Sequence, residues 1–185
     1  MEEDPKDNQG TDKINIDLLS PAAVTAKAES IGVQKAKNTL RATVMLGILA
    51  GTFIALAGEF YTMVIFDAQV GSSIAKLLGG LAFSLGLILV VMAGAELFTG
   101  NNLIVMACAN RRVSLGKLLR NWGLVYLGNL IGSLAMAVLV FWSRQYTFAN
   151  GALGANALAI ANAKTGLVFG QALALGVLCN MLVCL

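Results

Sequence analysis

The stretch GAELFTGNNLIVMA, residues 94–107, places hydrogen-bonding side chains inside a long apolar segment. It contains the carboxylate of Glu96, the hydroxyl of Thr99 and the adjacent amides of Asn101 and Asn102. Gly100 permits a positive φ, and asparagine side chains bond nearby backbone, so Thr-Gly-Asn-Asn is typical of a turn. Irregular backbone at membrane depth is tolerated only where protein or a water-filled cavity surrounds it. The stretch therefore predicts a spanning helix that is interrupted near residues 97–101.

An interrupted helix offers chemistry that needs no basic side chain. Its second half begins with free N–H groups and a partial positive charge, which attracts anions. We expect Glu96, Gly100 and Asn101 to cap or pin the broken backbone, since a fixed negative charge facing a pore would repel anions. The alternative is that the cluster ends an unbroken helix. The apolar run resumes before the charges at residues 111 and 112, which favours the break.

Several other kinds of chemistry find no support. The chain has no histidine, and its three cysteines lie in apolar segments at no metal-ligand spacing. It shows neither paired carboxylates nor a nucleophile motif, and no basic patch with interleaved aromatics. We therefore expect no enzymatic activity, no metal or other cofactor, and no nucleic-acid partner.

The elements that must position the cluster are membrane-spanning helices. Of the 185 residues 57% are hydrophobic and 12% charged, against about 25% charged in soluble domains. Residues 1–41 hold 13 of the 23 charged residues, so the rest of the chain carries only ten. This distribution predicts an all-α integral membrane protein with a polar N-terminal arm, and a lipid bilayer as its surroundings.

Three regions follow from this pattern. Residues 1–18 are predicted to be disordered, and residues 19–40, with Ser20-Pro21 as N-cap and first helical residue, to form a helix on the membrane surface. A plain solvated linker helix is the alternative for the second region. Residues 41–185 form the transmembrane domain, with spans predicted at 42–66, 74–108, 122–142 and 165–185. The second segment, at 35 residues, is too long for one span and contains the interruption.

The positive-inside rule sets the orientation. Eight bases flank one membrane side: Lys27, Lys35, Lys37, Arg41, Arg111, Arg112, Lys117 and Arg120. The opposite loops hold three, which are Lys76, Arg144 and Lys164. This count predicts a multi-pass protein of the cell inner (plasma) membrane with a cytoplasmic N-terminus.

The motifs AELFTGN and LGNLIGS, in this order, resemble the formate/nitrite transporter family. The resemblance extends over about residues 18–185. It implies an aquaporin-like helical bundle of six spans in two inverted repeats, each with a broken helix, of which this chain holds the first repeat and the start of the second. It also implies a homopentamer with one pore in each protomer.

The same resemblance implies a pore pathway. In the family pattern Phe83 and Leu87 line an outer constriction and Leu97 lies at the cytoplasmic slit, whereas ordinary packing or lipid contact is the alternative for all three. Thr99 would face the pore centre from the break. Two residues of the second repeat would polarise the region around the anion, namely Lys164 and Asn180; an interfacial lysine is the alternative for the former.

The sequence thus predicts transport of small monovalent anions, with formate favoured and nitrite or hydrosulfide as alternatives. A non-conducting structural or assembly subunit of a membrane complex is the second hypothesis. The family's central histidine belongs to a fifth helix, and this chain ends within the fourth, so we expect the reading frame to continue through two more spans.

Overall fold

The computed structural model describes residues 20–67 and 72–184, and every regular element in these two ranges is a helix. The predicted all-α membrane fold class is confirmed. The arm assigned to residues 1–18 lies outside the described residues. The helices are α1 (Pro21–Ala36), α2 (Leu40–Ile65), α3 (Ser73–Met92), α4 (Phe98–Asn101), α5 (Ile104–Ala109), α6 (Leu115–Trp142), the 3₁₀ turn η1 (Gln145–Thr147), α7 (Ala152–Thr165) and α8 (Phe169–Cys184).

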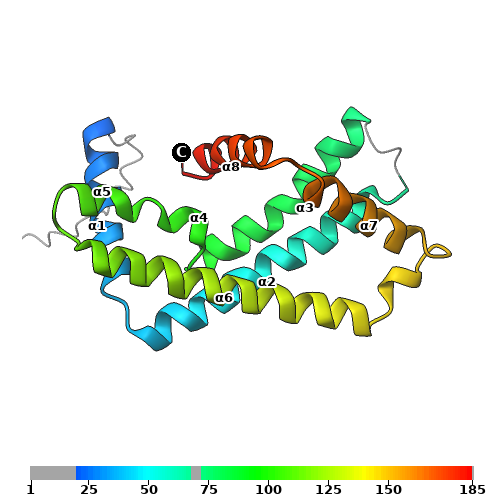
Figure 1. Ribbon diagram of the computed structural model, residues 1–185, viewed down its shortest axis with the longest axis horizontal. Coiled ribbons are helices and arrows are strands. Elements are labelled where there is room, and N and C mark those ends of the chain that lie inside the picture. The colour runs from blue at the N-terminus through cyan, green and yellow to red at the C-terminus, as the bar shows by residue number, and fades with distance from the viewer. Residues whose placement is uncertain (1–19, 68–71, 185) are drawn as a thin grey trace, which may run out of the picture.

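Three long helices form the body of the molecule (Figure 1), with α2 packed against both α3 and α6. All three are long and apolar enough to cross a membrane. The crossing of α2 with α6 depends on glycine, because a Cβ built on Gly128 would lie 3.0 Å from the Cα of Gly47. Small residues at a helix crossing allow such close backbone approach. This crossing brings the middle of α6 next to the chain that follows α3.

Helix α1 begins where the sequence predicts, with the Ser20 hydroxyl accepting a hydrogen bond from the Ala23 N–H at 3.3 Å. It packs against α5 at one end of the bundle (Figure 1). Gly32 faces Ile104 there, and Ala36 joins Ile104 and Ala107 in a buried apolar cluster. The N-terminal helix is therefore fixed to the second half of the interrupted span.

The interruption lies at residues 93–97, a few positions before the predicted one. Helix α3 ends at Met92 and α4 starts at Phe98, so Thr99, Gly100 and Asn101 belong to the first turn after the gap. The positive φ expected at Gly100 is found at Gly94 instead, with φ +61°. Thr99, Gly100 and Asn101 therefore lie at the start of the second half of the span, since α3 ends upstream, next to Gly94.

The last two predicted spans have different bounds in the structure. Helix α6 begins at Leu115 rather than near 122, with Ser114 at the N-cap position and Leu118 buried in the cluster with Ile104. The span predicted over 165–185 is shorter in the structure, because α7 extends to Thr165 and α8 covers Phe169–Cys184. The chain bends by 104° between the two helices. By length and composition the pair could form one broken span or a re-entrant loop.

Candidate functional site

The end of α3 is closed by the chain's own backbone. The N–H of Ala95 donates to the carbonyl of Val90 at 2.9 Å, and the N–H of Gly94 donates to that of Val91 at 3.2 Å. This pair of bonds around a left-handed glycine is the Schellman motif that ends many helices. Only glycine adopts the required backbone without steric cost. The position of the break is therefore set by Gly94.

The rest of the break is held by the neighbouring helices α2 and α6. The side-chain amide of Asn129 donates to the carbonyls of Gly47 at 2.8 Å and Glu96 at 2.9 Å. Its oxygen accepts the N–H of Phe98 at 2.9 Å, and the N–H of Glu96 donates to the carbonyl of Leu46 at 3.2 Å. One asparagine thus satisfies a carbonyl inside the gap and the first N–H of α4, as an apolar environment requires.

Glu96 is held by side chains rather than by backbone amides. The residue is 3% exposed, and its carboxylate accepts hydrogen bonds from Lys35 at 3.1 Å, Asn38 at 3.3 Å and Asn101 at 2.6 Å. The Lys35 ammonium also donates to the Asn101 oxygen at 2.8 Å. The buried negative charge is therefore matched by a positive charge from α1, as burial of an ion demands.

Asn101 extends these contacts to α6. Its side-chain nitrogen donates to Asn121 at 2.9 Å, and the Trp122 indole donates to its carbonyl at 3.1 Å. Asn101 is fully buried, so each of these bonds replaces one that water would otherwise make. We call Lys35, Asn38, Glu96, Asn101 and Asn121 the Glu96 network. It fixes α1, the break, α4 and α6 relative to one another.

Two predicted pore residues meet in a cavity of about 600 Å³ between α4 and α8. Thr99 and Asn180 both line it, and Cys184 joins them, accepting from the Asn180 amide at 3.6 Å and donating to the Thr99 carbonyl at 3.5 Å. The Asn180 side-chain oxygen is buried and has no hydrogen-bond partner among the described residues. The remaining walls are mostly apolar. The cavity therefore combines a few uncharged polar groups with hydrocarbon surroundings.

The other predicted pore residues lie elsewhere. Phe83 and Leu87 are one turn apart on α3 and partly exposed, at 41% and 44%. Leu97 packs against the buried cluster of Ala50, Val90 and Ala95, while Lys164 is exposed in the last turn of α7. None of the four lines the cavity that Thr99 and Asn180 share.

Sequence reasoning missed Asn129, Lys35, Asn38 and Asn121 as site residues. Lys35 was counted only for topology, and Asn129 lies inside a GxxxG pattern that indicated close packing alone. For Asn129 the available signal was a polar amide in the middle of an apolar helix, because such a group must find a hydrogen-bond partner in the membrane.

Within residues 20–67 and 72–184 no group of three or more His, Cys, Asp or Glu side chains could hold a metal ion. The fold and the site together define a multi-span helical membrane protein with an interrupted second span. Sequence comparison makes the class specific. The chain belongs to the formate/nitrite transporter family, whose sequence profile matches residues 22–185. The resemblance predicted from the two motifs is confirmed.

Relatives of known name are similar to most of this chain. The formate channel FocA of Escherichia coli K12 is 46% identical over 170 residues, which cover 91% of this chain and 60% of the relative. FocA of Haemophilus influenzae is 41% identical over 174 residues, covering 93% and 61%. A solved structure described as a pentameric formate channel with formate bound superimposes with a TM-score of 0.74 at 47% identity, covering 78% of this chain and 57% of that one. The chain thus spans about 60% of the length of the FocA relatives.

Proposed function

We propose that this chain supplies part of the pore of a membrane channel for small monovalent anions, with formate as the first candidate. The observation that carries the proposal is the cavity in which Thr99, at the start of the second half-helix, meets Asn180. The names of the FocA relatives and of the solved formate-bound channel support formate over other anions.

The proposed pathway uses hydrogen bonds rather than fixed charges. An anion that leaves water for an apolar channel faces a large desolvation cost unless polar groups replace its hydration. The Thr99 hydroxyl and the Asn180 amide offer such groups. The Glu96 carboxylate does not oppose entry, because Lys35 neutralises it and the network buries it. Phe83 and Leu87 would form the outer constriction and Leu97 the cytoplasmic slit, with Lys164 adding positive potential.

Glu96, Gly100 and Asn101 would serve this pathway indirectly. Through Lys35 and Asn121, the Glu96 network holds α4 at a fixed place, and Thr99 is part of α4. Gly100 belongs to α4 beside Thr99, with open space where a Cβ would lie. A correctly placed Thr99 therefore depends on groups that never touch the anion.

The proposed protein is a homopentamer in the inner (plasma) membrane, with a cytoplasmic N-terminus and no cofactor. Nitrite and hydrosulfide remain alternative substrates. The competing function is a non-conducting structural or assembly subunit, which the long exposed apolar faces of the helices would equally serve.

Flux into proteoliposomes separates these functions. Protein made from the complete reading frame is reconstituted, and the uptake of formate, nitrite and hydrosulfide is compared under the same gradient. We expect formate to enter faster than from protein-free vesicles and faster than the other two. Pentamers that assemble normally but pass none of the three anions would support the structural subunit instead.

A further inference from the structure

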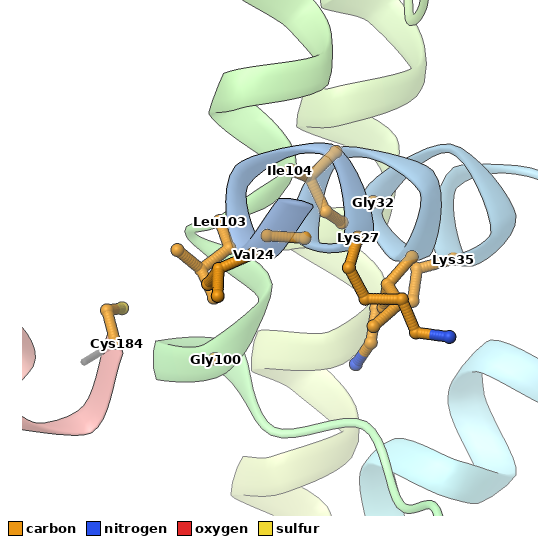
Figure 2. Close-up of a pocket in the computed structure, with 10 residues that line it drawn as sticks. Val24, Lys27, Gly32, Lys35, Gly100, Leu103, Ile104 and Cys184 are labelled. Carbon is orange, nitrogen blue, oxygen red and sulfur yellow. The ribbon is translucent and has the colours of Figure 1, made fainter. Parts of the chain in front are cut away.

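A second cavity, of about 400 Å³, lies between α1 and the start of the second half-span (Figure 2). Its α1 wall consists of Val24, Lys27, Ala28, Ile31 and Lys35, which share one face at helical spacing. The other walls come from α4, the residues between α4 and α5, α5, and Cys184 of α8. The lining is largely apolar, and its charged groups are the two lysines.

The two lysines are in different electrostatic situations. Lys35 is 28% exposed and already pairs with Glu96 at 3.1 Å. The Lys27 ammonium forms no ion pair or hydrogen bond with any residue of the described ranges, and its side chain is exposed. Figure 2 shows both side chains extending from the same side of α1. Among the described residues, the cavity therefore presents a positive charge without an acidic partner beside an apolar surface.

We propose that this cavity binds an anionic phospholipid of the leaflet in which α1 lies, with the lipid phosphate on Lys27 and an acyl chain along Val24, Ile31 and Leu103. Charge and polarity both select this ligand. An ammonium beside hydrocarbon walls is complementary to an anion attached to an apolar chain, and basic segments at the membrane surface attract anionic lipids. Val24 and Ile31 are exposed apolar residues that such a chain would cover.

A free small anion fits the cavity less well. A soluble phosphate would bind Lys27 but leave the walls of Ile31, Leu103 and Ile104 in water. The lipid removes that apolar area from water together with neutralising the charge.

Binding here would act on the break as well. The face of α1 that carries Lys27 also carries Lys35, which holds Glu96 and Asn101. A lipid seated between α1 and Leu103 keeps this face against α4 and α5. Lipid composition would then influence how firmly the second half-span is held, independently of which anion the channel conducts.

The test uses protein from the complete reading frame, purified in detergent and titrated with phosphatidylglycerol or phosphatidylcholine while bound lipids are counted by native mass spectrometry. We expect phosphatidylglycerol to bind more tightly. Lys27→Gln should weaken it about fivefold, the equivalent of about 1 kcal/mol for one lysine at a membrane surface. Lys37→Gln is the matched control, because Lys37 is an exposed lysine at the end of α1 that does not line the cavity.

Two further measurements make the result decisive. Ala28→Trp fills the cavity without changing charge and should also reduce phosphatidylglycerol binding. Inorganic phosphate should leave the thermal unfolding temperature of the wild type and Lys27→Gln equally unchanged. Equal loss in Lys27→Gln and Lys37→Gln, equal affinity for the two lipids, or phosphate stabilisation that requires Lys27 would each overturn the lipid site, the last in favour of a small-anion site.

Discussion

A single side chain, Asn129, resolves the main energetic difficulty of the interrupted span. A buried N–H or carbonyl without a partner costs about 1–3 kcal/mol, and the backbone between α3 and α4 carries such groups. Asn129 satisfies the Phe98 N–H and the Glu96 carbonyl while also bonding Gly47 of α2. The residue that matters most for the shape of the break therefore lies on another helix.

Replacing this amide should loosen the break. In Asn129→Leu the Phe98 N–H and the Glu96 carbonyl lose their partner, so we expect a loss of about 2–4 kcal/mol in stability and reduced formate flux. The measurement is thermal unfolding in detergent together with proteoliposome flux. Ser133→Ala is the control, because the Ser133 hydroxyl bonds only Leu130 of its own helix. A fully stable Asn129→Leu would mean that water or another group replaces the amide.

Thr99 tests the contact with the anion itself. Thr99→Val keeps the shape of the side chain and removes the hydroxyl, whose hydrogen bond is worth about 0.5–1.5 kcal/mol. We expect formate flux to fall about two- to tenfold while the oligomer still assembles. Thr52→Val, the same change at a hydroxyl that bonds Ile48 within α2, should leave flux unchanged. Equal flux in the two variants would place Thr99 outside the conduction pathway.

At the scale of elements, helix ends decide where the second span breaks. The sequence pointed to Thr-Gly-Asn-Asn, which is strong turn chemistry, and so placed the break at 97–101. The structure uses Gly94 to stop α3, and this glycine sits between two alanines that carry no turn signal. The sequence pattern located the interrupted segment but not the end of α3. That end depends on the left-handed backbone of Gly94 and the hydrogen bonds around it.

Replacing Gly94 or Gly100 with alanine should change the stability of the protein in different ways. Gly94→Ala forces a side chain into φ +61°, which costs about 1–2 kcal/mol, so the protein should unfold at a lower temperature. Gly100 is helical with open space around its Cα, and Gly100→Ala should be neutral or slightly stabilising, by up to about 1 kcal/mol. Thermal unfolding of both variants measures the difference. A more destabilising change at Gly100 would restore the predicted position of the turn.

The Glu96 network shows why part of the site was beyond the sequence. Glu96 was recognised as a buried carboxylate, but its partner Lys35 is 61 residues away and Asn129, which bonds its carbonyl, is 33 residues away. These pairs exist only after α1 packs on α5 and α6 crosses α2. The family resemblance implied that Thr99 and Asn180 both lie near the anion, and both line one cavity in the structure; spacing alone could not have related them.

At the scale of the whole molecule, most basic residues of the described ranges gather at one end of the bundle. Helix α1, the start of α2 and the loop before α6 meet there (Figure 1), and Arg112 of that loop lies 3.5 Å from Glu29 of α1. The start of α7 lies at the other end of α6. Helix α6 has 28 residues, or about 42 Å, which exceeds a hydrocarbon core of about 30 Å. Both of its ends should therefore emerge from the membrane.

This arrangement predicts which end of α6 faces the cytoplasm. Four bases precede or open α6, and only Arg144 follows it before α7, so the positive-inside rule keeps Leu115 inside and Asn150 outside. We expect a membrane-impermeant thiol reagent added to intact cells to label Asn150→Cys and not Leu115→Cys. The background replaces Cys108, Cys179 and Cys184 with serine. Both side chains are exposed, so permeabilised cells should label both variants and show that each thiol can react. Labelling of Leu115→Cys alone in intact cells would reverse the orientation, and with it the side from which the anion first meets Thr99.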